Sequence, residues 1–538
     1  MAQTSSVVKA NKRLPLRFAA GLLAGATLIS SVLGLIREWI LNSLYFKTYA
    51  TALDAYTVAF LIPDFMFFIL VSGALSVSFI PVFNQRLGSG NKRSAWELST
   101  SILNLMAIVT LIASVLIIVF AEPLVRYVVG PGLDESSTAL AVSMMRVIAI
   151  NPFLFAIATV ISSMQQAIGR FAFFAVAPIV YNVGIIIGAL FFTDGINLFG
   201  WQIFDGGIMG VALGVVLGSI LQLIVSSIGL LGMGFDYRFK IYWKNKGFRK
   251  VLSLLPARSL DQGIDYVNSI VETNLASRLA TGSVRAYQQA TLLMYMPINL
   301  IGVAISTAAF PKMTERIAEG RYDLFKFELQ SVLRVIFWLT IPVAVIAFFG
   351  RGYLVSFLVN GGDVLISSVF GMLAIAIVFR SIYHIAARSF YAQQDTKTPL
   401  YTSLFAVGLN IVLAVLFTMS FNLGVYGLAW ATAIVAVVEV AILFFLMSRR
   451  IKGLFDLKFI RAVTRMVVAA VIMGVVTYIM VQLMPFNANT GYLVNVLRFG
   501  SIAAVSGIFY FALSVAFKLH EVDPIIGRMK KILFYKAR

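Results

Sequence analysis

The stretch that decides the fold is Gly207–Leu213, with the sequence GIMGVAL, because it recurs later in the chain as GVYGLAW at Gly424–Trp430. In both copies a polar residue follows at the same distance inside an apolar run, Gln222 in the first and Glu439 in the second. Two more sets recur in the same order: Gln165, Gln166 and Asn182 as Gln393, Gln394 and Asn410, and Pro81 with Arg86 as Pro311 with Arg316. Membrane proteins with two similar halves usually bind their cargo between the halves and expose it alternately to each side. The repeat therefore favours a carrier.

The composition predicts a membrane protein. Hydrophobic residues make up 60% of the chain and charged residues 12%, against about 45–50% and about 25% in ordinary soluble domains. Since a bilayer takes about 20 apolar residues per helix, the sequence predicts an all-α polytopic protein with about fourteen spans, near residues 17–40, 53–83, 98–121, 138–164, 173–193, 207–233, 251–276, 286–310, 328–349, 364–387, 399–420, 424–448, 462–484 and 494–517. We expect six spans in each half and two more at the C-terminus. Because each half has an even number of spans, the two pseudo-repeats are parallel.

The basic residues indicate how the chain is oriented. We expect a basic N-terminus at 1–16, an N-lobe at 17–233, a basic linker at 234–250, a C-lobe at 251–448, a basic loop at 449–461, two further spans at 462–517 and a basic tail at 518–538. The basic segments all fall on one side of fourteen crossings, and positive charge is retained in the cytoplasm. The net charge of +20 thus predicts cytoplasmic termini and contact with membrane lipids, and not a nucleic-acid partner.

Several classes of chemistry are disfavoured. The chain has no Cys and two His, which excludes disulfides and thiolate metal sites and leaves too few imidazoles for a metal cluster. It has no GxxxxGK[ST] phosphate loop, so we do not expect it to hydrolyse ATP by itself. We predict a transporter that is not an enzyme and has no cofactor, driven by Na⁺, H⁺ or the membrane potential.

Ionisable residues inside the predicted spans are candidates for function, because each is costly there unless paired or hydrated. The seventh span carries a polar stripe at helical spacing: Arg258, Asp261, Gln262, Asp265, Asn268 and Glu272. The stripe predicts the lining of a wet cavity, with an internal salt-bridge ladder as the alternative. Asp265 and Glu272 have no obvious partner on their helix and are candidate proton or cation sites. Asp64 and Glu439 are candidates of the same kind, unless a neighbouring hydroxyl or amide satisfies them.

The most specific local pattern lies in the first two spans: SSVLGLIRE at Ser30–Glu38, DAYTVAFLIPD at Asp54–Asp64 and GALSVSFIP at Gly73–Pro81. With FYAQQDTKTP at Phe390–Pro399, this pattern resembles the MurJ/MviN family of bacterial lipid II flippases, within the superfamily of multidrug and polysaccharide-lipid exporters. The resemblance implies an inner-membrane protein with two six-helix lobes around a central cavity. It also implies that the spans at 462–517 form a groove for the polyprenyl tail of the lipid.

The chain departs from that family where a cationic cavity is expected. Family members usually carry Arg at the positions of Ser31, Phe67 and Leu292, and of the cavity arginines only Arg37 matches. An anionic diphosphate needs positive charge in a membrane cavity. We therefore expect Arg258 to supply part of the missing charge and Arg37 with Asp54 to form a gating pair. Ser30 and Asp64 complete the candidate substrate site. The structural alternative is that Arg37 only pairs with Glu38 or Asp54.

Three functions remain open. The leading hypothesis is a flippase that moves a polyprenyl-diphosphate-linked sugar, such as the peptidoglycan precursor lipid II, across the inner membrane by alternating access. The second is a cation-coupled exporter of amphipathic small molecules that uses Asp261, Asp265 or Asp64. The third is a non-transporting scaffold that inherited the repeat. For a flippase, the expected partners are the lipid-linked precursor, membrane lipids and cell-wall synthesis proteins.

Overall fold

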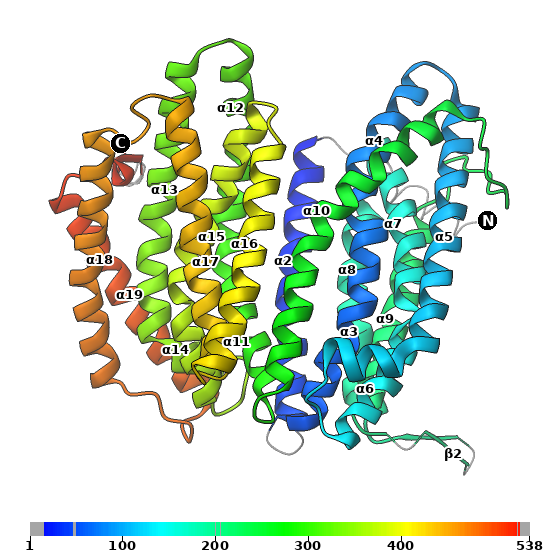
Figure 1. Cartoon of the computed structure of the whole chain (residues 1–538), viewed down its shortest axis with the longest axis horizontal. Helices are drawn as coiled ribbons and strands as arrows, with labels where there is room; N and C mark the ends of the chain where they lie inside the picture. The colour runs from blue at the N-terminus through cyan, green and yellow to red at the C-terminus, as the bar shows by residue number, and fades with distance from the viewer. Residues whose placement is uncertain (1–15, 47–49, 199–200, 205, 525, 528–538) are drawn as a thin grey trace, which may run out of the picture. The chain divides into compact units, whose positions relative to one another are not determined.

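The computed structural model describes residues 16–46, 50–198, 201–204, 206–524 and 526–527. By its contacts the chain divides into two compact units, 1–285 and 286–538. In Figure 1 the first unit runs from blue to green and the second from green to red. Each unit is built almost entirely of long helices.

The first unit contains the following elements: α2 (Leu16–Tyr45), α3 (Ala50–Phe67), η1 (Phe68–Ser72), α4 (Gly73–Gly88), α5 (Lys92–Pro123), η2 (Leu124–Val129), α6 (Glu135–Ile148), α7 (Asn151–Ile168), α8 (Ala172–Ile187), η3 (Gly188–Phe192), β1 (Ile196–Leu198), β2 (Trp201–Phe204), α9 (Met209–Ile228) and α10 (Lys246–Ser277). The two strands pair in antiparallel fashion and form a short hairpin. This hairpin lies between the helices predicted as the fifth and sixth spans.

The second unit contains α11 (Ser283–Pro297), which begins at the boundary, followed by η4 (Ile298–Val303), α12 (Ala304–Ala318), α13 (Tyr322–Phe349), α14 (Arg351–Ser356), α15 (Val364–Ala392), α16 (Lys397–Val415), η5 (Leu416–Ser420), α17 (Val425–Arg450), α18 (Leu457–Leu483), α19 (Tyr492–Ala516) and η6 (His520–Val522). The last of these is a 3₁₀ turn. The other η segments are single π-helical turns.

The predicted polytopic fold is confirmed. Within the part of the chain that is described, thirteen helices are long and apolar enough to cross a membrane. They correspond to all the predicted spans except the seventh. That segment forms α10, a helix of 32 residues, which is about 48 Å long at 1.5 Å per residue. The polar stripe predicted from the sequence explains why its composition alone does not identify it as a span.

The sequence repeat has a structural counterpart in the interruptions of the helices. The second span is α3, η1 and α4, and the eighth, six spans later, is α11, η4 and α12. A π turn thus breaks both, with a proline before it, Pro63 or Pro297, and another after it, Pro81 or Pro311. The fifth span ends in η3 and the eleventh in η5. Helices broken at matching positions of two repeats are the usual position of a transporter's binding site, so the break in span two indicates where a site in the first unit is to be sought.

Small residues allow α8 and α9 to approach closely. A Cβ atom on Gly184 would lie 2.3 Å from the Gly218 Cα, and one on Gly214 would lie 2.6 Å from the Gly188 Cα. No side chain fits at those distances, so the two backbones are in direct contact. In a membrane, where van der Waals packing replaces the hydrophobic effect as the force between helices, such small-residue faces bring helices together.

The sequence assigns the seventh span to a C-lobe at 251–448, whereas in the structure α10 belongs to the first unit. Phe248, Val251 and Leu255, near its start, lie in a buried cluster with side chains of α4, α5 and α7. Farther along, Tyr266 stacks on Phe68 of η1, with ring centroids 4.5 Å apart. These apolar contacts hold one face of α10 against the other helices of the first unit. The periodicity of the sequence tells which residues share a face of α10, but not which helices that face contacts.

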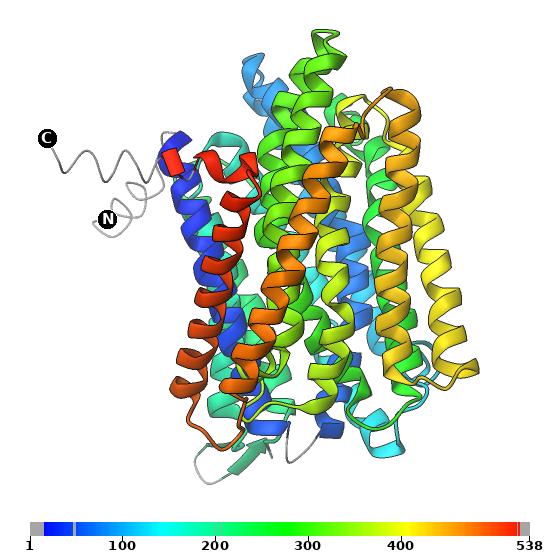
Figure 2. The same cartoon turned by 90° about the vertical axis from the view of Figure 1, so that its left-hand side faces the viewer.

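The last two spans pack beside α13 within the second unit, as Figure 2 shows in orange and red. Ala469, Ala470 and Met473 of α18 form a small core with Tyr510 of α19, against which Trp338 of α13 packs. The Trp338 indole also donates a hydrogen bond to Ser514 Oγ, 3.0 Å away. The outward faces of both helices are apolar and exposed, for example at Val471 and Ile508. A groove for a lipid tail between these helices stays a prediction.

Candidate functional site

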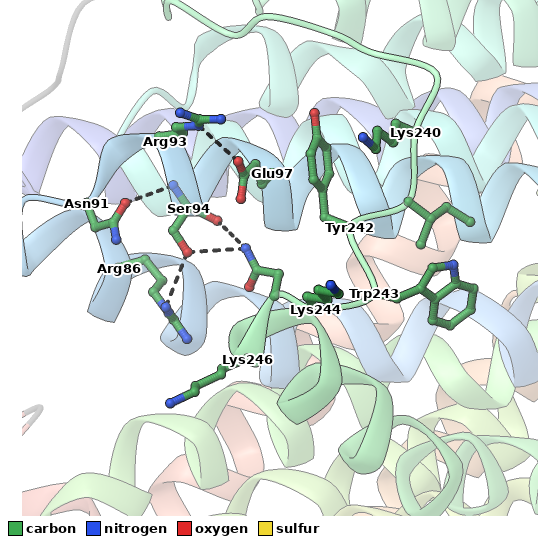
Figure 3. A pocket seen from close by; sticks show the side chains of 12 residues that line it. Arg86, Asn91, Arg93, Ser94, Glu97, Lys240, Tyr242, Trp243, Lys244 and Lys246 are labelled. Carbon is green, nitrogen blue, oxygen red and sulfur yellow. Dashed lines mark hydrogen bonds and ion pairs between the residues drawn. The ribbon is translucent and has the colours of Figure 1, made fainter.

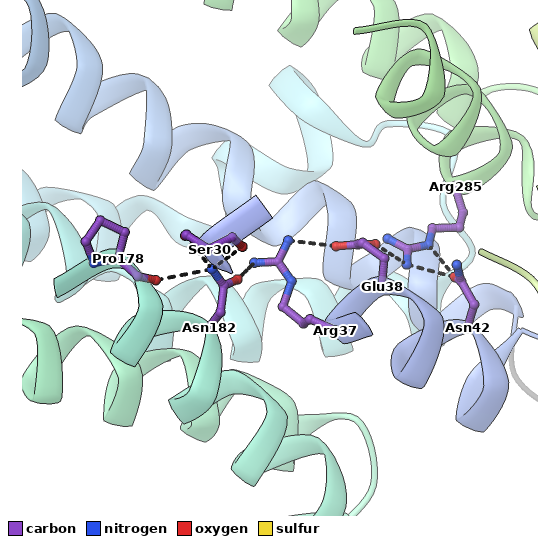
Figure 4. A network of polar contacts seen from close by, with 7 residues as sticks. All are labelled: Ser30, Arg37, Glu38, Asn42, Pro178, Asn182 and Arg285. Carbon is purple, nitrogen blue, oxygen red and sulfur yellow. Dashed lines mark hydrogen bonds and ion pairs between the residues drawn. The ribbon is translucent and has the colours of Figure 1, made fainter. Parts of the chain in front are cut away.

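A buried network of charged side chains lies in the first unit and is centred on α2 (Figure 4). Glu38 accepts a hydrogen bond at each carboxylate oxygen: Oε1 from Arg37 Nη2 and Oε2 from Arg285 Nη2, both at 2.8 Å. The Arg285 side chain is 1% exposed and the Glu38 side chain 9%. Arg285 also donates to Asn42 Oδ1 through Nη2 at 2.8 Å and through Nε at 3.2 Å. The network thus links Arg285, the last residue of the first unit, to the C-terminal half of α2.

Arg37 is held from its other side by Asn182 of α8. Arg37 Nη1 donates to Asn182 Oδ1 at 3.2 Å. The amide nitrogen of Asn182 donates in turn to Ser30 Oγ at 3.2 Å, and to the carbonyls of Ser30 and Pro178. These donations fix the orientation of the Asn182 amide, so that its oxygen faces the guanidinium. The Arg37 Nε is buried and has no hydrogen-bond partner among the described residues, and its side chain keeps 24% exposure.

Asp54 ties α3 to the turn that precedes α11. Its two oxygens accept hydrogen bonds from the backbone N–H of Gly282 at 2.6 Å and of Arg285 at 2.8 Å. The carboxylate therefore caps the start of α11, where the helix leaves N–H groups unsatisfied. The predicted gating pair of Arg37 and Asp54 is wrong: Arg37 pairs with its neighbour Glu38, and backbone amides satisfy Asp54. Ser30, by contrast, is joined to Arg37 through Asn182.

Asp64 lies in α3, near enough to the network to feel the charge of Arg37. It interacts electrostatically with Arg37, and so do Tyr56 and Tyr181. The described part of the chain provides no hydrogen-bond donor to the Asp64 carboxylate. Arg37 and Asp64 thus offer a donor and an acceptor of opposite charge near each other. A group with both a proton donor and an anionic oxygen, or a small cation at Asp64, fits that chemistry.

The other predicted site residues do not join this network. Glu272 accepts a hydrogen bond from Asn268, one turn earlier on α10, at 2.9 Å, so the expectation that it has no partner on its own helix is wrong. The side chains of Arg258, Asp261 and Asp265 lie outside the described residues. Their roles as replacement cation and ion-coupling sites stay predictions.

Glu439, in the second unit, is satisfied by its neighbours and is 2% exposed. Arg380 Nη1 donates to its Oε2 at 3.0 Å, and Ser403 Oγ to its Oε1 at 2.9 Å. Ser403 is also hydrogen-bonded to Tyr383. This bears out the alternative that a neighbouring hydroxyl satisfies Glu439, with an ion pair in addition. Among the described residues, no group of three or more His, Asp or Glu side chains could hold a metal ion.

Arg285 is the residue that sequence reasoning missed. It follows Gly282–Val284 directly and stands at the start of the predicted eighth span, where a charged residue can be taken for a snorkelling side chain. The signal in the sequence was its position directly after a glycine turn. Such a turn fixes the backbone at the start of the helix, and an arginine there can point its side chain into the protein. At one of the family's arginine positions the structure has instead an apolar contact: the Phe67 ring packs against Phe155 at 5.4 Å.

A multi-spanning helical protein with matched interruptions in two repeats and a charge-balanced polar network beside one of them is typical of secondary transporters. The comparisons with known proteins define the family more closely. The family model described as lipid II flippase MurJ matches residues 46–497, and the chain belongs to this family.

Relatives in several bacteria carry related names. A probable lipid II flippase MurJ of Thermotoga maritima is 27% identical over 515 residues, which cover 93% of this chain and 97% of that protein. One of Vibrio cholerae is 27% identical over 493 residues, 87% of this chain and 89% of the relative. A structure of a lipid II flippase MurJ in an inward closed conformation shares the fold, with a TM-score of 0.73 and 24% identity over 91% of this chain and 99% of that one. An inward-facing multidrug resistance MATE transporter of the MOP superfamily has a TM-score of 0.66 at 16% identity, over 80% of this chain and 96% of that one.

Proposed function

We propose that the protein is a lipid II flippase of the bacterial inner membrane, with both termini in the cytoplasm. It takes the polyprenyl-diphosphate-linked headgroup from the cytoplasmic leaflet and releases it on the outer side by alternating access, while the lipid tail stays in the bilayer. Membership of the MurJ family supports this function over a multidrug exporter or a scaffold. No bond is made or broken, so the protein acts as a transporter and needs no catalytic residue or cofactor.

The single observation that carries the proposal is the state of Arg37. Its guanidinium has five N–H donors; Glu38 and Asn182 each accept one hydrogen bond from it, and its Nε has no partner among the described residues. Each Nη atom carries a second N–H that these two bonds do not use, and the side chain is 24% exposed although its Nε is enclosed, so a diphosphate oxygen can bind at this end of the guanidinium. Glu38 keeps a charge partner when this happens, because Arg285 pairs with the same carboxylate as Arg37. The network can thus admit an anion without leaving a buried carboxylate alone.

Asp64 is our proposed coupling group. A carboxylate beside Arg37 without a described hydrogen-bond donor can take up a proton or Na⁺ and change the local charge by one. When it is neutralised, the surroundings of Arg37 become more favourable to an anionic headgroup. When it is ionised, it competes with the headgroup for Arg37. Coupling by Asp64, like association with cell-wall synthesis proteins, is a prediction of this proposal.

Depletion of the protein in its host tests the function. We expect the polyprenyl-linked peptidoglycan precursor to accumulate in the cytoplasmic leaflet, measured by its protection from an enzyme or label supplied outside the cell. Expression of the wild-type chain should restore export, and an Asp64→Asn variant should restore it with an altered dependence on pH or Na⁺. Normal export in depleted cells that have no other flippase would refute the proposal.

A further inference from the structure

A second polar feature of the first unit lies away from the Arg37 network. It is an open groove of about 810 Å³ between the beginning of α5 and the linker that precedes α10 (Figure 3). We call it the linker groove. Five of its described lining residues are cationic: Arg86, Arg93, Lys240, Lys244 and Lys246. The one carboxylate among them, Glu97, is paired with Arg93 at 3.1 Å, so four positive charges have no acid to balance them within the lining.

The linker groove is built by specific hydrogen bonds. Asn245 donates through Nδ2 to the carbonyl and the hydroxyl of Ser94, at 3.0 and 3.2 Å. Arg86 Nη1 donates to the same hydroxyl at 3.2 Å. Asn245 and Asn91 are also the N-caps of α10 and α5, so two helices begin at the groove and add the partial positive charge of their N-termini. The cations are therefore presented from a fixed frame.

The linker is also bound to the side of α5. Tyr242 N donates to Ser101 Oγ at 2.8 Å, and Asn104 Nδ2 donates to the carbonyls of Arg238 and Lys240 at 2.8 and 3.0 Å. About one turn beyond Asn104, α5 begins an exposed apolar face that runs from Ile108 to Val119. In a membrane protein such a face contacts lipid tails. The end of the groove at Lys240, whose carbonyl Asn104 holds, thus lies near the level where the tails end and the phosphate groups begin.

Exposed aromatic side chains on the linker mark the same level. Phe239 is 82% exposed and Trp243 is 55% exposed, and both stand next to lysines of the groove. Aromatic and basic residues side by side, at the edge of an apolar belt, are typical of the membrane interface. An acidic soluble protein would match the charge of the groove, but it would not account for the bulky apolar side chains at this depth.

We propose that the linker groove binds the phosphate headgroup of an anionic phospholipid in the leaflet that faces the linker. The phosphate lies among Lys240, Lys244 and Lys246, and Trp243 lies along the upper part of the acyl chains. The bound lipid is separate from the transported one and does not depend on transport. It fixes the linker between the sixth span and α10 against the membrane.

Native mass spectrometry of the full-length protein in detergent tests this proposal. The protein is titrated with phosphatidylglycerol or with phosphatidylcholine of the same chain length. A variant carrying Lys240→Gln, Lys244→Gln and Lys246→Gln removes three exposed charges from the groove. A matched control carries Lys452→Gln, Lys458→Gln and Arg461→Gln, which remove three exposed charges from the start of α18 and the loop before it. Thermal unfolding of each variant confirms that the fold is kept.

We expect wild type and control to retain phosphatidylglycerol in preference to phosphatidylcholine. The groove variant should bind phosphatidylglycerol at least about tenfold more weakly, because each basic residue near an anionic lipid surface contributes on the order of a fivefold factor. Equal affinity in the groove variant, or an equal loss in the control, would overturn the proposal. So would displacement of the lipid by millimolar inorganic phosphate or by a poly-glutamate peptide, since the site would then recognise a free anion or an acidic protein.

Discussion

Arg285 and Glu38, which are 247 residues apart in the sequence, form an ion pair of 2.8 Å in the interior of the first unit. Arg37 shares the same carboxylate. The two arginines differ in their surroundings: the Arg285 side chain is 1% exposed, whereas the Arg37 side chain keeps 24% exposure.

Arg285→Ala should destabilise the protein. The change leaves Glu38 and Asn42 buried with fewer partners, and removal of one member of a buried pair commonly costs about 3–5 kcal/mol. The measurement is thermal unfolding of the purified variant. As a control, Arg126→Ala breaks an exposed pair with Glu135, where the loss should be below about 1 kcal/mol. Equal effects of the two changes would contradict the structural role of Arg285.

Arg37→Ala should abolish export while the protein still accumulates, because Arg285 keeps Glu38 paired. Arg37→Lys should retain part of the export, since an ammonium still attracts a diphosphate but lacks the forked geometry of the guanidinium. Export in depleted cells and protein level in membranes are measured together. Normal export by a well-accumulated Arg37→Ala variant would remove this residue from the mechanism, and failure to accumulate would make it structural.

Gly214→Ala should weaken the packing of α8 against α9. The added methyl group would lie 2.6 Å from the Gly188 Cα, so the helices must separate. Gly408→Ala is the matched control, since it adds the same methyl group to a helix where no atom lies within 4 Å. We expect the unfolding temperature to fall in the first variant and to stay level or rise in the second, because alanine favours helix by about 0.5–1 kcal/mol. A similar response at both positions would argue against the close backbone contact.

Asp395, in the turn before α16, should make stability depend on pH only under strong acid. Burial raises the pKa of Asp395, but hydrogen bonds from Thr398 and Arg450 outweigh burial and lower that pKa to about 2. A lowered carboxyl pKa means that its stabilisation is present above the ordinary value of 3.8 and is lost as the pH falls toward 2.

Asp395→Asn should therefore lower stability by about 1 kcal/mol or less at neutral pH, since the group is partly solvated. Arg450→Gln should have a similar effect, and the double variant should add little to either single change. The unfolding temperature of each is measured at about pH 7 and about pH 5. A loss of the Asp395 contribution between those two values would contradict the lowered pKa.

Single cysteines test the proposed orientation, and the chain has no native cysteine to interfere. Cysteines introduced at Lys244 and Lys452 should react with a membrane-impermeant label only from the cytoplasmic side, and one at Asp194 only from outside. All three positions are exposed in the structure. Labelling of position 244 from outside would overturn both the orientation and the number of crossings before it.

The sequence alone was sufficient for the membrane-spanning helical fold and its repeat, because a bilayer imposes simple rules on composition and length. The repeat identified from Gly207–Leu213 and Gly424–Trp430 predicted equivalent spans, and the π turns after Pro63 and Pro297 confirm the equivalence. A local pattern singled out Arg37 and Ser30, which the structure joins through Asn182. The same pattern singled out Asp54, but not its partners, because backbone amides that arrive from a distant segment leave no local signal.

What only the tertiary structure decided is which charges meet. Hydropathy and periodicity report the environment of a residue along its own helix, whereas an ion pair such as Arg285 with Glu38 depends on where two distant helices come together. The same reason explains α10: its polar stripe was visible in the sequence, but its membership of the first unit follows from apolar contacts with α4, α5 and η1. Composition thus determined that the chain crosses a membrane many times, and packing determined which buried charge is shared and which arginine keeps part of its side chain exposed.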